Sequence, residues 1–190
     1  MRVLGVDPGT ATLGYGVVDA SPREPFRLVE CGILRTRSDE SLPARLRLIH
    51  DGIAELIGRH RPDIVAVETA FYAKNVHTTA VLSHARGVIL LAAETAQVTI
   101  AEYAPRLVKK TVVGTGSALK PQVAYMVAQL LRLKAAPSPA DAADGVAIAL
   151  THLLLSGRQS RPLSSKASAL AAGRAGKAGK AGKAGGRVGG

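Results

Sequence analysis

Short apolar runs mark the strands of this chain. Residues 2–7 and 63–68 are each apolar and end in an acid, a pattern typical of buried strands. Pro8 and Gly9 form a turn signal, and residues 14–19 then predict a strand that returns beside the first as a hairpin. The remaining strands are predicted at residues 26–34 and 98–103.

Longer segments repeat apolar residues at the helical period. Ile49, Ile53 and Leu56 recur on one face of a helix. Ser41 is placed to cap that helix, and Pro62 is placed to end it. Further helices are predicted at residues 78–97, 105–113, 121–133 and 138–155. A hairpin of strands, followed by strands that alternate with helices, predicts an α/β fold in which a mixed sheet is flanked by helices.

The pattern stops near Gly157. From residue 164 onward the chain consists mostly of Ala, Gly, Ser and Lys, and it cannot bury enough apolar surface to offset the entropy of ordering. A length of 190 residues fits one domain with an appendage. We therefore predict a single folded domain over residues 1–156 and a flexible, disordered basic tail over residues 157–190.

The charge of the chain points to an anionic partner. Twenty-five Lys and Arg against 14 Asp and Glu give a net charge of +11, and eight of the basic residues follow Ser156, where there is no acidic residue. A basic chain of this kind favours nucleic acid as the partner. The alternative is a tail that serves only solubility.

Several classes of protein are excluded by composition. The single cysteine, Cys31, cannot form a disulfide framework within the chain or a cysteine-rich zinc site. No apolar run reaches the roughly 18 residues of a membrane span. The N-terminal segment MRVLGVDPGT lacks the pattern of a signal peptide. We therefore expect a cytoplasmic protein with no membrane partner.

Four carboxylates stand out by position. Asp7 and Glu68 each end an apolar strand, and ligand sites of open α/β sheets lie at the carboxyl ends of strands. Asp141 and Asp144 are spaced i, i+3 in DAADGVAIAL, so they project from one face of the first turn of a helix. Together the four would form an all-oxygen cluster that calls for hard divalent cations. Two such cations can support phosphodiester hydrolysis.

Each of these residues also has a structural interpretation. Acids in a first helical turn complement the helix dipole, and an acid at a strand end often caps a turn. The hairpin VDPGTATLGYGVVD is also similar to the phosphate-binding hairpin of the actin–hexokinase–chaperone ATPases, which are longer proteins with two such domains. The histidines His77, His84 and His152 have no ligand spacing and are interpreted as ordinary core or surface residues.

Longer strings of the sequence resemble one known family. The matching segments are GVDPGT and GYGVV, IVAVE and TAFYAKN, ARGV, RLVKKTVVGTGSALK, and ADAADGVAIALTHL, and they span about residues 2–155. On these strings the chain resembles the RuvC family of bacterial Holliday-junction resolvases. The strings VKKTVVGTGSA and DAADGVAIA are specific, whereas DPGT alone is not. The resemblance implies an RNase H-like fold.

The resemblance also implies the roles of particular residues. It makes Asp7, Glu68, Asp141 and Asp144 the catalytic metal ligands, with aspartate at a place where some members carry histidine, that of Asp141. It makes Phe71 the aromatic residue that probes the junction.

Basic residues are the remaining candidates for DNA contact. The resemblance makes Lys109 and Lys120 phosphate contacts near the active site. Lys120 precedes Pro121 at a predicted helix start, where unpaired backbone N–H groups would also meet a phosphate. Lys74, Arg106 and Lys110 are further candidates of the same kind.

These observations predict a metal-dependent endonuclease that resolves four-way (Holliday) junctions. We expect two Mg²⁺ ions per active site, with Mn²⁺ as the other candidate, and products with 5′-phosphate and 3′-hydroxyl ends. The resemblance implies a homodimer that cuts two opposed strands symmetrically, and a functional link to the RuvA–RuvB branch-migration complex. A junction-binding module without nuclease activity and an actin-like ATPase are the alternatives.

Overall fold

A computed structural model describes residues 1–21, 24–69 and 76–159. Its strands form one five-stranded mixed sheet in the order β3-β2-β1-β4-β5. The first three strands pair antiparallel as a meander, whereas β1, β4 and β5 run parallel. The strands are β1 (Arg2–Asp7), β2 (Thr12–Ser21), β3 (Glu24–Arg35), β4 (Ile64–Glu68) and β5 (Thr99–Tyr103).

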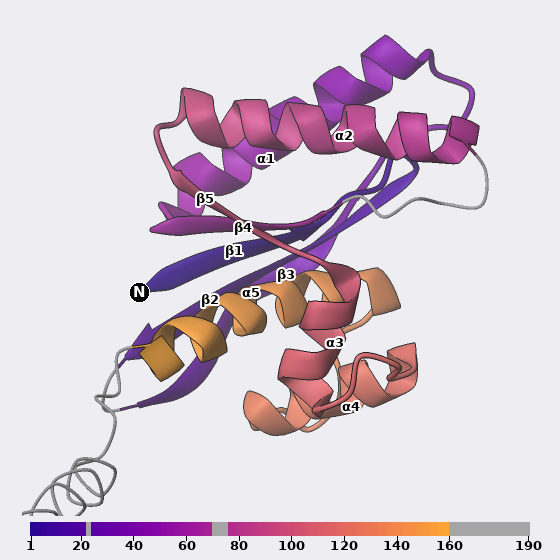
Figure 1. The fold of residues 1–190 in the computed structure, drawn as a ribbon. Coiled ribbons are helices and arrows are strands. Elements are labelled where there is room, and N and C mark those ends of the chain that lie inside the picture. The colour runs from indigo at the N-terminus through magenta and orange to yellow at the C-terminus, as the bar shows by residue number, and fades with distance from the viewer. Residues whose placement is uncertain (22–23, 70–75, 160–190) are drawn as a thin grey trace, which may run out of the picture. The chain divides into compact units, whose positions relative to one another are not determined.

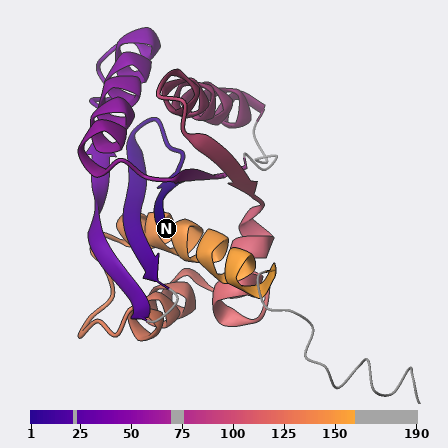
Figure 2. The same cartoon turned by 90° about the vertical axis from the view of Figure 1, so that its left-hand side faces the viewer.

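Helices cover both faces of the sheet. Figure 1 shows α1 and α2 over one face and α5 over the other, with α3 and α4 beyond it, and Figure 2 shows the same separation after a quarter turn. Each face has its own apolar core. The helices are α1 (Leu42–His60), α2 (Val76–Thr95), α3 (Pro105–Val113), α4 (Lys120–Leu130) and α5 (Ala140–Gln159).

The central strand β1 shows why the chain needs two layers of helices. Successive side chains of a strand point to opposite faces of the sheet. Leu4 and Val6 therefore pack in the core under α1 and α2, while Val3 packs in the core under α5. All three side chains have no exposed surface. A strand that is apolar on both faces is stable only between two covering layers.

Helix α5 lies directly against the strands because glycines leave room for its backbone. A Cβ on Gly14 of β2 would lie 1.8 Å from the carbonyl oxygen of Asp141, and a Cβ on Gly5 of β1 would lie 2.2 Å from that of Gly145. Side chains at these two positions would push the helix away from the sheet. The close approach brings the beginning of α5 to the edge of the sheet where β1 ends.

The structure confirms each predicted strand and helix but moves several boundaries. The helix expected at 78–97 ends at Thr95, and Gln97 takes a left-handed φ of 55°. The helix expected at 121–133 ends at Leu130, and Arg132 takes a φ of 53°. A residue with positive φ cannot continue a right-handed helix, so both helices end before the predicted residue.

Two other expectations about helix ends were wrong in detail. Ser41 occupies the cap position of α1, but its side chain makes no cap hydrogen bond. Helix α5 continues to Gln159 rather than ending at residue 155, since no proline interrupts it before Pro162. The end of the folded domain at residue 156 stays a prediction, because residues 160–190 lie outside the described part of the chain. Within the described ranges, no helix is both long and apolar enough to cross a membrane.

Candidate active site

Four carboxylates from three parts of the fold meet at one edge of the sheet. Asp7 ends β1 and Glu68 ends β4, and these strands are parallel neighbours in register, so their last residues lie side by side. Asp141 and Asp144 lie at the beginning of α5, which the glycine contact brings to the same edge. The site therefore depends on the carboxyl ends of β1 and β4 and on the beginning of α5.

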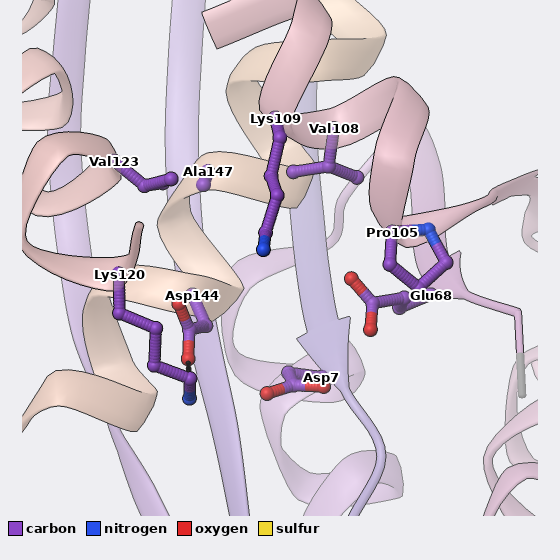
Figure 3. Close-up of a pocket in the computed structure, with 9 residues that line it drawn as sticks. All are labelled: Asp7, Glu68, Pro105, Val108, Lys109, Lys120, Val123, Asp144 and Ala147. Carbon is purple, nitrogen blue, oxygen red and sulfur yellow. Dashed lines mark hydrogen bonds and ion pairs between the residues drawn. The ribbon is translucent and has the colours of Figure 1, made fainter. Parts of the chain in front are cut away.

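The carboxylates form two overlapping sets. Asp7, Asp141 and Asp144 each offer an oxygen, and these oxygens lie within 4.8 Å of one another. Glu68 joins Asp7 and Asp144 in lining a pocket of about 220 Å³, shown in Figure 3. Asp141 does not line that pocket, and its side chain is 43% exposed, against 21% for Asp144. The four residues are close together, but Asp141 lies on the solvent side.

Burial and repulsion favour the protonated form of two of these acids. Burial raises the pKa of Asp7 to about 7, and the nearby Asp144 and Asp141 raise it as well. Burial raises the pKa of Glu68 to about 8, with further contributions from Asp7 and Asp144. Since a buried negative charge is unfavourable unless a cation is near, the pocket favours either protons or a bound cation.

Lys120 is one cation already at this site. Its Nζ lies 2.6 Å from Oδ2 of Asp144 and 3.9 Å from Oδ1 of Asp141. The hydrogen bond to Asp144 raises the pKa of Lys120, so the ammonium stays charged. The residue begins α4, where Pro121 follows it, as predicted.

Lys109 faces the same pocket from α3. Figure 3 shows its side chain pointing from the helix toward the carboxylates. Its charge lowers the pKa of Glu68 and so opposes the larger effect of burial. Two lysines from two helices therefore lie across the pocket from the strand carboxylates.

The donor set fits a hard divalent cation. In the described part of the chain, three aspartates are placed to hold a metal: Asp7, Asp141 and Asp144. Carboxylate oxygens are the ligands that Mg²⁺ and Mn²⁺ take. A cation among them would relieve the repulsion that raises the pKa of Asp7 and of Glu68. The chemistry of the site therefore agrees with a metal, without selecting between the two ions.

The other predicted DNA contacts lie away from the pocket or outside the described residues. Arg106 and Lys110 are exposed on α3 and do not line the pocket, unlike Lys109 on the same helix. Phe71 and Lys74 fall in residues 70–75, which the structure does not describe.

Part of the pocket was not anticipated from the sequence. Its apolar wall is formed by Pro105, Val108, Val123 and Ala147. Val108 and Val112 are spaced i, i+4 on α3, which was a signal of a buried helix face but not of a pocket. Which apolar residues border a cavity depends on how three helices pack, and local spacing does not contain that information.

Sequence comparison places the chain among known nucleases. Residues 3–152 match the family model described as crossover junction endodeoxyribonuclease RuvC. A protein of that name from Chlorobium phaeovibrioides is 44% identical over 170 residues, which cover 88% of this chain and 90% of the relative.

Comparison of structures agrees with the sequence match. The solved structure of RuvC from Thermus thermophilus has a TM-score of 0.76 at 37% identity, and the match covers 86% of this chain and 100% of that chain. A second structure shows the T. thermophilus protein in complex with a Holliday junction substrate, with a TM-score of 0.76 at 36% identity and the same coverage. These likenesses confirm the predicted RNase H-like fold.

Proposed function

The chain belongs to the RuvC family of crossover junction endodeoxyribonucleases, and from this premise we propose that its acidic pocket cuts opposed strands of a four-way DNA junction with two bound divalent metal ions. Membership of the family makes the chain a nuclease that hydrolyses phosphodiester bonds. The two alternatives, a binding module without nuclease activity and an actin-like ATPase, are therefore set aside. The observation that carries the residue assignment is the meeting of four carboxylates at one sheet edge.

Asp7, Glu68, Asp141 and Asp144 would hold the metal ions, which we propose to be Mg²⁺. When bound, the ions supply activation of the attacking water and stabilisation of the charge on the phosphate and the leaving oxygen. The carboxylates themselves fix where these charges develop, because each is attached to a strand end or a helix that is buried in the core. Two acids with raised pKa values support this role, since such acids gain most from a cation.

Lys120 and Lys109 would position the scissile phosphate. Lys120 is held by Asp144 but its side chain is 64% exposed, so it can turn from the carboxylate to a phosphate oxygen that enters the pocket. Lys109 approaches the same pocket from α3. The 3′ oxygen leaves, so the products should carry 5′-phosphate and 3′-hydroxyl ends that a ligase can seal.

The remaining contacts with the junction are proposed on charge and resemblance. Phe71 would stack on an unpaired base near the crossover, and Lys74 would contact phosphate beside it. Arg106 and Lys110, exposed on α3, would contact the phosphates of an adjacent arm.

We also propose that two copies of the chain act together. A four-way junction with two opposed scissile strands has two-fold symmetry, and a two-fold dimer matches it. A solved relative in complex with a Holliday junction substrate supports the choice of substrate. A functional link to the RuvA–RuvB branch-migration complex and a cytoplasmic location complete the proposal.

A synthetic four-way junction with one end-labelled strand tests this function. The protein is incubated with the junction, and with a linear duplex of the same sequence, in EDTA, Mg²⁺ or Mn²⁺. We expect paired nicks near the crossover that require a metal and do not form in the duplex. A junction that is bound but never cut, across several sequences and both metals, would overturn the assignment of the pocket.

A further inference from the structure

Tyr103 and His152 form a polar contact beside the acidic site that the proposed chemistry does not use. Tyr103 is the last residue of β5, and its hydroxyl oxygen lies 2.7 Å from Nδ1 of His152 on α5. The two rings meet edge to face, with centroids 6.0 Å apart and an interplanar angle of 66°. Burial raises the pKa of Tyr103 and lowers the pKa of His152, so the contact is a hydrogen bond between a neutral hydroxyl and a neutral imidazole.

Backbone pairing between β4 and β5 places Tyr103 beside Glu68. The two residues are register partners in the parallel β4–β5 pair. The next residue, Thr69, donates its backbone N–H to the Tyr103 carbonyl oxygen at 2.9 Å, and its hydroxyl reaches the same oxygen at 3.4 Å. Tyr103 therefore lies opposite Glu68 in the sheet and fixes the residue that follows it.

The two side chains also lie on the same face of the sheet. Tyr103 packs against the core under α5, as does Ala66, which precedes Glu68 by two residues on β4. Residues two apart on a strand share a face, so the Glu68 side chain lies beside Tyr103. Neither Tyr103 nor His152 lines the pocket.

His152 lies on the same helix, α5, as the other two carboxylates, Asp141 and Asp144. It follows Asp141 by about three helical turns on nearly the same helix face. The first half of α5 rests on β2 and β1 at the Gly14 and Gly5 contacts, and His152 ties the second half to β5 at the far edge of the sheet. Besides its apolar core residues, the helix thus has a polar contact with β5 in its second half.

We propose that the Tyr103–His152 hydrogen bond is a positioning device, which fixes the angle of α5 across the sheet and so the separation of Glu68 from Asp144. The inference rests on the proposed function of these carboxylates as metal ligands. The four acids fall into a strand pair, Asp7 and Glu68, and a helix pair on α5. Without the hydrogen bond, the apolar core residues of α5 still hold the helix on the sheet, but its angle is less narrowly fixed, and so is the distance between the two pairs.

The test removes the hydrogen bond with minimal change in shape. Tyr103→Phe deletes the hydroxyl and keeps the ring. His152→Leu removes the hydrogen-bonding ring, whereas His152→Asn places an amide group, which can donate or accept, close to the position of Nδ1. Tyr15→Phe is the matched control, because its hydroxyl donates at 2.8 Å to Glu30, among residues that do not line the pocket.

The main readout is Mn²⁺ binding by the full chain without DNA, measured from the electron paramagnetic resonance of free Mn²⁺. We expect Tyr103→Phe and His152→Leu to weaken Mn²⁺ binding by about two- to tenfold, the range that loss of one hydrogen bond can produce. His152→Asn should restore most of the affinity, and Tyr15→Phe should leave it unchanged. The metal concentration for half-maximal junction cleavage should rise in parallel, with junction affinity in EDTA unchanged.

The possible failures are distinguishable. If Tyr103→Phe and His152→Leu bind Mn²⁺ as tightly as the parent chain, or lose no more than Tyr15→Phe, the pair has only a structural role and the inference is overturned. If Asp7→Asn also binds Mn²⁺ as tightly as the parent chain, the metal site of the proposed function fails, and the inference fails with it. A lowered Tm in Tyr103→Phe, His152→Leu and His152→Asn with unchanged Mn²⁺ affinity counts against the inference alone.

Discussion

At Asp7 and Glu68, burial and mutual repulsion oppose the charge that the site needs. The pKa of Asp7 is raised to about 7 and that of Glu68 to about 8, so a substantial fraction of each acid is protonated near neutral pH when no cation is present. Metal binding must displace these protons, which makes metal affinity fall as the pH falls. Burial and repulsion of these carboxylates lower the stability of the metal-free protein, and they favour the binding of a divalent cation.

Replacing Asp7 by Asn should abolish cleavage and leave junction binding intact. The change removes a carboxylate from the centre of the acidic cluster while keeping its size. Loss of several kcal/mol of charge stabilisation corresponds to a fall of at least about 10³-fold in the cleavage rate. The rate is measured on a labelled junction, and binding by gel shift in EDTA. Asp51→Asn, an exposed acid of α1, is the control. Substantial cleavage by the Asp7 variant would remove this residue from the metal site.

Replacing Glu68 by Gln should stabilise the metal-free protein at pH 8 while abolishing activity. The folded pKa of about 8 lies above the ordinary value of 4.5, so between these limits the folded state holds a proton that the unfolded state has lost. Stability therefore falls as the pH rises from about 4.5 to about 8, and glutamine removes this loss. In EDTA at pH 8 we expect Tm to rise by at least about 2–4 °C, equivalent to about 1 kcal/mol.

The sign of this effect can be checked within the same experiment. At pH 5 Glu68 is protonated in the folded state, so the Gln variant should gain little there. Glu55→Gln, an exposed glutamate of α1, serves as the control at both pH values. An equal gain at pH 5 and pH 8 would mean that the buried charge is not its cause.

At the scale of elements, the active site depends on how closely α5 approaches the sheet. The beginning of the helix carries Asp141 and Asp144, and the strands carry the other two carboxylates. Gly14 has room for no side chain, since a Cβ there would lie 1.8 Å from the backbone of Asp141. The glycine therefore serves the fold and the site at once.

Gly14→Ala should lower both stability and cleavage. The added methyl group meets backbone atoms, so α5 must shift, and overpacking of this kind costs about 1–3 kcal/mol or more. Gly58→Ala is the matched control, because nothing lies within 4 Å of its Cβ and it is inside α1. That control should gain about 0.5–1 kcal/mol from helix propensity. Urea unfolding and junction cleavage check both variants, and a Gly14 variant as stable as the parent would contradict the packing argument.

At the scale of the whole molecule, charge is distributed unevenly along the chain. Eight of the 25 basic residues follow Ser156, and no acidic residue does. The tail cannot bury apolar surface, so the sequence predicts that it contributes to DNA affinity without contributing to stability.

Deleting residues 160–190 should leave Tm unchanged and make junction binding less dependent on salt. The deletion removes seven basic residues. The slope of log K against log salt should fall by about 0.9 for each tail cation that contacts a phosphate. The measurement is junction affinity in EDTA across a series of salt concentrations. An unchanged slope would favour the alternative in which the tail serves only solubility.

Much of the fold and of the site was predictable because the signals are local. The apolar runs that end in Asp7 and Glu68 indicate buried strands. The i, i+3 spacing of Asp141 and Asp144 places both on one face of a helix. The ends of several helices were not predicted. Positive φ at Gln97 ends a segment whose composition is still helical.

The sequence by itself determined which elements form, which residues carry the candidate chemistry and which family the chain resembles. Only the tertiary structure decided that Lys120 pairs with Asp144, that Asp141 lies on the solvent side and that Tyr103 meets His152. The physical reason is that hydrophobic period and spacing record the local surroundings of each segment. Contacts between segments far apart in the chain depend on how closely, and at what angle, α5 packs on the sheet.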